Sequence, residues 1–197
     1  MSDVLERVLD SADREVGGGS AAALAAAMAA GLAGMVARLS VGRDLVLGDA
    51  RYEVLAAEAD TLSAALLAGA REDAEAYALV AAAYRARPNG EPEATARRVA
   101  IDEALIVAAR APLENAHRAL RVLALGGELE GRSNPAAASD LAVARLLADA
   151  GVSGCLANVA VNLGALHDSA GAADVRREAE SVRIAHARAG APLKERT

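Results

Sequence analysis

Apolar and polar positions alternate with helical spacing along almost the whole chain. Apolar residues recur every three or four positions over residues 3–13, which predicts a short amphipathic helix. Gly17, Gly18 and Gly19 then break the pattern, and Ser20 is a suitable N-cap for the next helix. That helix is predicted to run to about Ser40, because Gly42 is a typical stop signal.

The middle of the chain predicts two long helices joined by a turn. Residues 49–86 place charges on one side and leucines on another, as one helix or as two with a break near Gly69. Pro88-Asn89-Gly90 has the chemistry of a turn. The following helix starts at Glu91-Pro92 and extends to about Leu125, with Pro112 expected to kink or interrupt it.

The last third of the chain predicts two further helices. Residues 126–133 form a polar connection, and Asn134-Pro135 supplies an N-cap and a first-turn proline for a helix to about Leu166. A charged helix follows over residues 172–189, with a frayed tail at 191–197. The chain is thus expected to be a single all-α domain, residues 1–197, built as a bundle of five to seven helices.

The composition supports this assignment and specifies the kind of core. There are 54 alanines among 197 residues, no Trp, no Phe and three tyrosines, and the dominant residues are strong helix formers. Small side chains allow helices to approach closely, and Gly151 and Gly154 indicate tight packing inside their helix. Because alanine buries little area, many residues must be buried, and oligomerisation is one way to achieve this.

Charge and cysteine content exclude several classes of protein. With 21 basic and 27 acidic residues the net charge is −6, which provides no general attraction for nucleic acid. The lone cysteine, Cys155, fits a reducing compartment, and we expect a cytoplasmic protein. Residues 16–37 carry no charge and are long enough to cross a bilayer, but alanine and glycine dominate them. We therefore expect a buried, Ala- and Gly-rich central helix and no membrane contact.

Familiar nucleotide and metal motifs are absent or lack their context. Gly17, Gly19 and Ala22 match a dinucleotide fingerprint, yet an amphipathic helix precedes them where that motif requires a strand. What remains is a glycine-rich loop at a helix N-terminus, which favours a carboxylate or another anion. The three histidines are far apart and none has a partner at metal-ligand spacing, so no metal site is predicted.

Polar residues within apolar stretches carry more information. Asp140 and Asn158 lie 18 residues apart, which is five helical turns, and Asn162 is only about 40° away from their line. Asp140 and Asn158 are about 27 Å apart along the axis, so one small group cannot touch both in one chain. They could mark the ends of a long ligand or two sites across a symmetric dimer. Alternatively, the asparagines only bond to helix ends or neighbours.

Asp73, Tyr77 and Tyr84 also share one helix face, because offsets of 4 and 11 residues return to nearly the same direction. Several charged residues lie nearby in the sequence. Taken alone, this pattern favours a solvated face with two amphipathic tyrosines.

Three blocks of sequence together resemble the cyclodeaminase/cyclohydrolase family of folate enzymes. They are GGGSAAAL from Gly17, NPAAASD from Asn134 and NVAVNL from Asn158, and their order and spacing carry the resemblance. It covers nearly the whole chain. Asp73 and Pro112-Leu113 fall where the family's other recurring residues are expected.

The resemblance implies a homodimer that binds a reduced folate and needs no cofactor beyond that tetrahydrofolate substrate. The implied activity is that of methenyltetrahydrofolate cyclohydrolase or formiminotetrahydrofolate cyclodeaminase, two enzymes of one-carbon metabolism. Both reactions pass through a tetrahedral carbon between N5 and N10, which calls for proton transfer beside a cationic carbon. The candidate catalytic residues are Asp73 and Asp140. The candidate substrate-binding residues are Gly18, Gly19, Ser20, Tyr77, Asn134, Ser139, Asn158 and Asn162.

Two other hypotheses remain open at this stage. Val16, Ser133 and Ala136 stand where the family usually has proline, glycine and asparagine. These differences are compatible with a catalytically silent protein that binds folate or a helical partner. A purely structural Ala-rich bundle is the third possibility.

Overall fold

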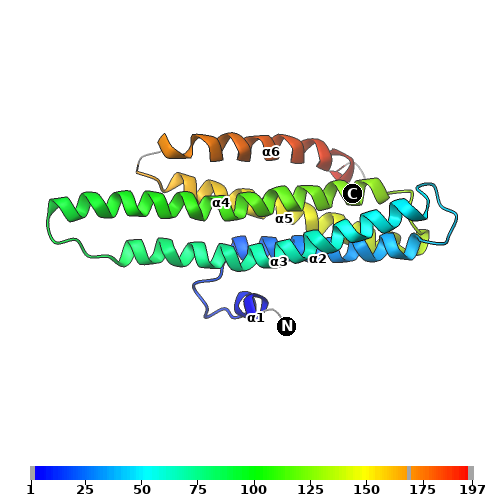
Figure 1. Ribbon diagram of the computed structural model, residues 1–197, viewed down its shortest axis with the longest axis horizontal. Helices are drawn as coiled ribbons and strands as arrows, with labels where there is room; N and C mark the ends of the chain where they lie inside the picture. The colour runs from blue at the N-terminus through cyan, green and yellow to red at the C-terminus, as the bar shows by residue number, and fades with distance from the viewer. Residues whose placement is uncertain (1–2, 168–169, 195–197) are drawn as a thin grey trace.

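The computed structural model describes residues 3–167 and 170–194, and over these residues the chain is helical with no strand (Figure 1). Two short 3-10 turns, Pro135–Ala137 and Ala170–Ala172, precede the last two helices. The all-α prediction is confirmed. The six α-helices are α1 (Asp3–Leu9), α2 (Gly18–Ser40), α3 (Asp49–Arg85), α4 (Glu91–Leu129), α5 (Ala138–Gly164) and α6 (Ala173–Lys194).

Helix α2 is the central element of the bundle. It packs against α3, α4 and α5, while α6 lies along one side of the bundle and α1 on the opposite side (Figure 1). Two helical stretches, Gly18–Ser40 and Pro135–Gly164, are long and apolar enough to cross a membrane by length and composition alone. In the first of them 67% of the apolar window is buried by the other helices. The predicted buried central helix is therefore confirmed.

Close packing of α2 against α5 depends on residues without side chains. A Cβ atom at Gly151 would lie 2.8 Å from the Cβ of Ala26, and one at Gly154 would lie 2.8 Å from the Cβ of Ala22. Such distances are too short for real side-chain contacts, so the two helix backbones approach as closely as glycine permits. The tight packing predicted for these glycines is confirmed.

Several predicted helix boundaries differ from the structure. Helix α3 does not break at Gly69, because one glycine costs a long helix only about 1 kcal/mol. Helix α4 passes through Pro112 without interruption. It ends at Leu129 and not at about Leu125, because the burial of Leu129 outweighs the low helix propensity of Gly126 and Gly127. Helix α5 ends at Gly164, and α6 continues past residue 191 to Lys194. The last three residues of the expected tail lie outside the described residues.

Of the two predicted N-caps, one is confirmed and one is wrong. The Asn134 side chain accepts a hydrogen bond from the backbone N–H of Ala136 at 3.0 Å, so it is an N-cap as predicted, but of the 3-10 turn Pro135–Ala137 that leads into α5 at Ala138. Helix α2, in contrast, begins at Gly18 with Gly17 as its N-cap, so Ser20 is the third residue inside the helix. Ser20 is fully buried and does not line the cavity described below, but its hydroxyl group donates a hydrogen bond to Asp73 of α3.

Candidate active site

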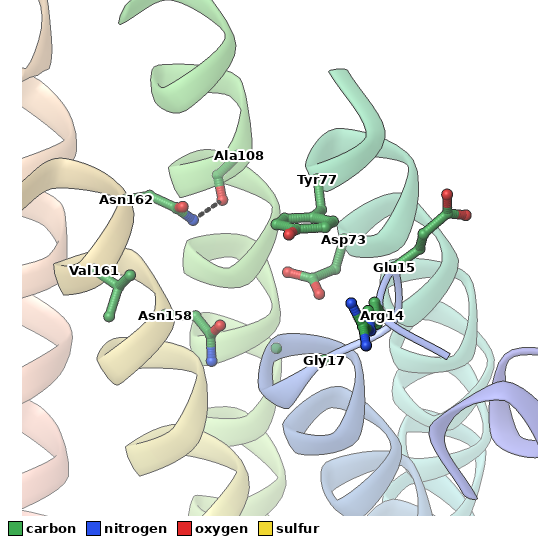
Figure 2. A pocket seen from close by; sticks show the side chains of 10 residues that line it. Arg14, Glu15, Gly17, Asp73, Tyr77, Ala108, Asn158, Val161 and Asn162 are labelled. Atoms are coloured by element: carbon green, nitrogen blue, oxygen red, sulfur yellow. Dashed lines mark hydrogen bonds between the residues drawn. The ribbon is translucent and has the colours of Figure 1, made fainter. Parts of the chain in front are cut away.

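A cavity of about 260 Å³ lies beside the N-terminal end of α2. Helices α3, α4 and α5 and the connection that precedes α2 all contribute to its wall (Figure 2). Its polar side chains come from segments that are far apart in the sequence. The lining residues are Arg14, Glu15, Gly17, Gly19, Asp73, Tyr77, Ala108, Asn158, Val161 and Asn162.

Asp73 of α3 is held against the first turn of α2. The Ser20 hydroxyl donates a hydrogen bond of 2.9 Å to Asp73 Oδ2. A Cβ atom at Gly19 would lie 2.6 Å from that oxygen and 2.7 Å from Asp73 Cγ, so the carboxylate can keep this position only beside a glycine. Because the N-cap Gly17 has no side chain, the Asp73 carboxylate supplies the negative charge that a helix N-terminus favours.

The environment of Asp73 shifts its proton affinity. Burial raises the pKa of Asp73 above the usual value of 3.8, while bonds from the Ser20 hydroxyl and backbone N–H oppose the shift. The net direction is upward, toward the range in which a carboxyl group can both accept and release a proton near neutral pH. Its position at the cavity and the direction of this shift make Asp73 suited to general acid–base chemistry.

The asparagines of α5 line the opposite wall. Asn158 Nδ2 donates to the carbonyl of Gly154 at 2.9 Å. Asn162 Nδ2 donates to the carbonyl of Ala108 at 2.7 Å (Figure 2). The sequence left open whether these asparagines bond to helix ends or neighbours, and the structure shows that both bond to helix backbone. Both residues nevertheless also face the cavity. Gly18 belongs to the same region, because a Cβ atom there would lie 3.4 Å from Asn158 Nδ2.

The two tyrosines that share a face with Asp73 have different positions. Tyr77 lines the cavity next to Asp73 and is about half exposed (Figure 2). Tyr84 is also exposed but lies two turns further along α3 and is not part of the lining. The pattern therefore identified the correct face and one of its two aromatic residues.

Asn134, Ser139 and Asp140 lie elsewhere in the chain. The Asn134 backbone N–H donates to Ser40 Oγ at 2.9 Å, and its Nδ2 donates to the Leu39 carbonyl at 3.1 Å, which places it at the C-terminal end of α2. Asp73 lies at the other end of that helix, about 33 Å away at 1.5 Å per residue. Within one chain, the structure does not bring these three residues into the cavity.

Four lining residues were missed by sequence reasoning: Arg14, Glu15, Ala108 and Val161. Arg14 and Glu15 directly precede the glycine run, so their position beside a predicted binding loop was the available signal. Val161 is flanked by the asparagines on α5. Ala108 contributes its backbone carbonyl, a group that a search for polar side chains does not detect.

The other reactive side chains do not form a second centre. Cys155 is buried, and burial together with the nearby charge of Asp73 raises its pKa to about 12, so it is an inert thiol. Within residues 3–167 and 170–194, no group of three His, Cys, Asp or Glu side chains is placed to hold a metal ion.

Similar proteins share both the sequence and the fold. The formiminotransferase-cyclodeaminase family matches residues 2–181. A methenyltetrahydrofolate cyclohydrolase from Methylorubrum extorquens is 34% identical over 185 residues, which cover 92% of this chain and 89% of that protein. A formimidoyltransferase-cyclodeaminase from Rattus norvegicus is 34% identical over 148 residues, 75% of this chain but only 27% of the longer relative.

The structural comparison agrees. A formiminotetrahydrofolate cyclodeaminase from Thermotoga maritima has the same fold, with a TM-score of 0.77 at 23% identity, and the match covers 94% of this chain and 91% of that one. The family match extends over most of the chain and includes every residue of the cavity wall. The chain therefore belongs to the formiminotransferase-cyclodeaminase family.

Proposed function

We propose that this protein is an enzyme of folate one-carbon metabolism, with methenyltetrahydrofolate cyclohydrolase or formiminotetrahydrofolate cyclodeaminase activity. The observation that carries the proposal is the Asp73 carboxyl group, which lies half-buried at the N-terminus of α2 and faces a cavity of small-molecule dimensions. The Methylorubrum extorquens cyclohydrolase supports it, because the similarity extends over most of both chains.

In the cyclohydrolase direction, water adds to the methenyl carbon between N5 and N10. Asp73 accepts a proton from this water as the new C–O bond forms, and the product is a neutral tetrahedral carbon. The C–N5 bond then breaks, N5 takes a proton, and the hydroxyl proton leaves as the formyl C=O forms on N10. The net reaction consumes one water and releases one proton.

In the cyclodeaminase direction, N10 attacks the carbon of the protonated formimino group, and Asp73 would accept the proton that N10 loses as the new C–N10 bond forms. The same carboxyl group would return this proton to the resulting amino group, which leaves as ammonia as its C–N bond breaks and the methenyl cation forms. A pKa above the usual Asp range suits both roles, because the group must change its protonation state within one cycle. The negative charge of Asp73 also stabilises the cationic methenyl carbon that is common to both reactions.

The size of the cavity indicates which part of a reduced folate it would hold. At about 260 Å³ it is slightly smaller than the usual pocket for a drug-sized ligand. We propose that it encloses the reacting ring system, with the exposed ring of Tyr77 against one face, and that the remainder of the substrate extends outward past Arg14.

We further propose that the enzyme works as a homodimer with shared sites. On α5, Val143, Leu146 and Val161 are 47%, 57% and 71% exposed, and the apolar window of Pro135–Gly164 is only 33% buried. An exposed apolar face of this length is typical of an interface with another chain. In a twofold dimer the two α5 helices can run antiparallel. If the twofold axis crosses α5 at the level of Gly151 along the helix, Asp140 of one protomer lies opposite Asn162 of the other, because both residues are 11 positions from Gly151 in the sequence.

The activity is tested by assaying the purified protein separately with methenyltetrahydrofolate and with formiminotetrahydrofolate. Turnover of either supports the proposal, and Asp73→Asn should lower kcat/KM at least about 100-fold, as expected for loss of a general base. Binding of a reduced folate without turnover of either compound would instead identify a silent folate-binding protein. Absence of both binding and turnover would leave a structural bundle.

Shared sites are tested with co-expressed, differently tagged chains. A heterodimer of Asp73→Asn with Asp140→Asn keeps one intact shared site and should show about half of wild-type activity. A heterodimer of wild type with the double variant should be inactive, because each shared site then contains one changed residue. Sites confined to single chains would give the reverse pattern, and a monomer in sedimentation at micromolar concentration would refute the dimer.

A further inference from the structure

The backbone of α4 has an interrupted hydrogen bond beside the cavity. In an α-helix each carbonyl accepts from the N–H four residues later, but Pro112 has no N–H to offer the carbonyl of Ala108. Ala108 is 4% exposed, so bulk water does not readily replace the missing donor. A buried carbonyl without a partner is costly, and another donor is required.

Asn162 of α5 supplies that donor. Its Nδ2 lies 2.7 Å from the Ala108 carbonyl oxygen, and both residues line the cavity (Figure 2). A carbonyl oxygen can only accept, so it distinguishes the two ends of the planar amide: Nδ2 faces it and Oδ1 points away. With the opposite orientation two acceptors would face each other. The bond therefore fixes the direction of the Asn162 amide.

This arrangement differs from that of the neighbouring asparagine. Asn158 Nδ2 bonds to the carbonyl of Gly154, four residues earlier in the same helix, which can also accept the backbone N–H of Asn158. The carbonyl of Ala108 has no such helical donor. Asn162 is accordingly the more firmly oriented of the two amides.

We propose that Pro112 is a positioning residue of the cavity, which frees the Ala108 carbonyl and thereby presents Asn162 Oδ1 to the ligand as an acceptor. The Asp73 carboxylate is a second acceptor in the same cavity. A wall of this kind selects a ligand edge that carries N–H donors, such as an amino group and a ring N–H, over an edge that carries acceptors. Only the identity of the ligand rests on the proposed function; the orientation of the Asn162 amide is argued from the structure alone.

The first test needs no substrate. In ¹⁵N-labelled, ligand-free protein, the Asn162 side-chain NH₂ signals are assigned from their loss in Asn162→Leu, and their exchange with solvent is measured. Pro112→Ala restores a backbone donor to the Ala108 carbonyl, and alanine is the better helix former, so this variant is expected to fold. We expect the exchange of the Asn162 NH₂ protons with solvent to accelerate about tenfold, which is the factor that corresponds to the loss of one neutral hydrogen bond.

The matched control is Pro92→Ala, an exposed proline in the first turn of the same helix. It should leave the Asn162 exchange rate unchanged. Equal exchange rates in Pro112→Ala and wild type would overturn the inference, and this result would stand whether or not the protein turns over a folate.

The second test is a double-variant cycle of Pro112→Ala and Asn162→Leu with the substrate that the enzyme uses. If the proline acts through Asn162, Pro112→Ala alone should raise KM about five- to tenfold with kcat changed less than about twofold. The same change in the Asn162→Leu background should have no further effect. Equal losses in both backgrounds, or a loss in kcat without one in KM, would overturn the positioning role.

Discussion

Gly19→Ala is the most direct test of how α2 and Asp73 build the site. The new Cβ atom would lie 2.6 Å from Asp73 Oδ2 and 2.7 Å from Asp73 Cγ, whereas real Cβ contacts stay above 3.0 Å. Both groups belong to packed helices, so the carboxylate must swing away. It would then lose its 2.9 Å bond from Ser20.

The size of the effect follows from opposing contributions. Loss of a hydrogen bond to a charged group costs about 1.5–3 kcal/mol. The greater helix propensity of alanine returns at most about 1 kcal/mol. The net loss in unfolding free energy should thus be about 1–2 kcal/mol. A displacement of about 1 Å at a catalytic group commonly costs about 100-fold in rate, so kcat/KM should fall by roughly that factor.

Urea denaturation and steady-state kinetics measure the two effects. The matched control is Gly127→Ala on the exposed side of α4, where nothing lies within 4 Å of the new Cβ atom. It should gain about 1 kcal/mol and keep its kinetics. In an Asp73→Ala background the clash is gone, and Gly19→Ala should no longer destabilise. If Gly19→Ala is as stable and as active as Gly127→Ala, the position of the Asp73 carboxylate does not depend on the absence of a side chain at residue 19.

Four further predictions concern Asp73, Cys155 and Gly151. Because the pKa of Asp73 is raised above 3.8, kcat/KM should rise with pH through an inflection above that value, and Asp73→Asn should remove this limb of the profile. Because the folded state holds this proton more tightly than the unfolded state, the contribution of Asp73 to the free energy of unfolding is fully present below pH 3.8 and is lost as pH rises through the folded-state pKa. The urea midpoint of Asp73→Asn should lack this pH dependence. Cys155, with its pKa raised to about 12, should react with Ellman's reagent only after unfolding, and rapid labelling of native protein would contradict its burial. Gly151→Ala should lower the free energy of unfolding, measured in urea, by roughly 1–3 kcal/mol. The reason is that its Cβ atom would lie 3.1 Å from the Ala22 carbonyl and 2.8 Å from the Cβ of Ala26. An unchanged urea midpoint would show that the two helices can separate without loss of stability.

Local signals in the sequence predicted those features whose partners are also local. Asn134 is a typical example, because its side chain bonds the backbone only two residues later. The same rule failed at Ser20, because Asp73, 53 residues further along the chain, occupies the helix N-terminus instead. A cap supplied across helices leaves no trace in the residues around the helix start, and only the packed structure identifies it.

The candidate site divides in the same way. Helical periodicity correctly placed Asp73 with Tyr77 on one face, and it correctly separated Asp140 from Asn158 along α5. It could not say which helices meet, so it left open whether Asp140 and Asn158 mark the ends of one long ligand or two sites across a symmetric dimer. The Ala108 carbonyl was missed although a signal for it exists, since a proline inside a helix frees the carbonyl four residues earlier.

The scarcity of aromatic residues gives this cavity its chemical character. With no Trp or Phe in the chain, Tyr77 is the aromatic side chain among the described lining residues, and stacking can hold at most one face of a flat ring. Discrimination must then come from the ring's edge, through acceptors such as Asn162 Oδ1, while Asp73 serves the reacting carbon. Sites built from fixed hydrogen-bonding groups reject analogues that lack the matching donors far more strongly than apolar pockets reject a change in size. A cavity wall with an acceptor amide that a proline orients should therefore tolerate changes at the exposed end of a folate and reject changes to its N–H groups.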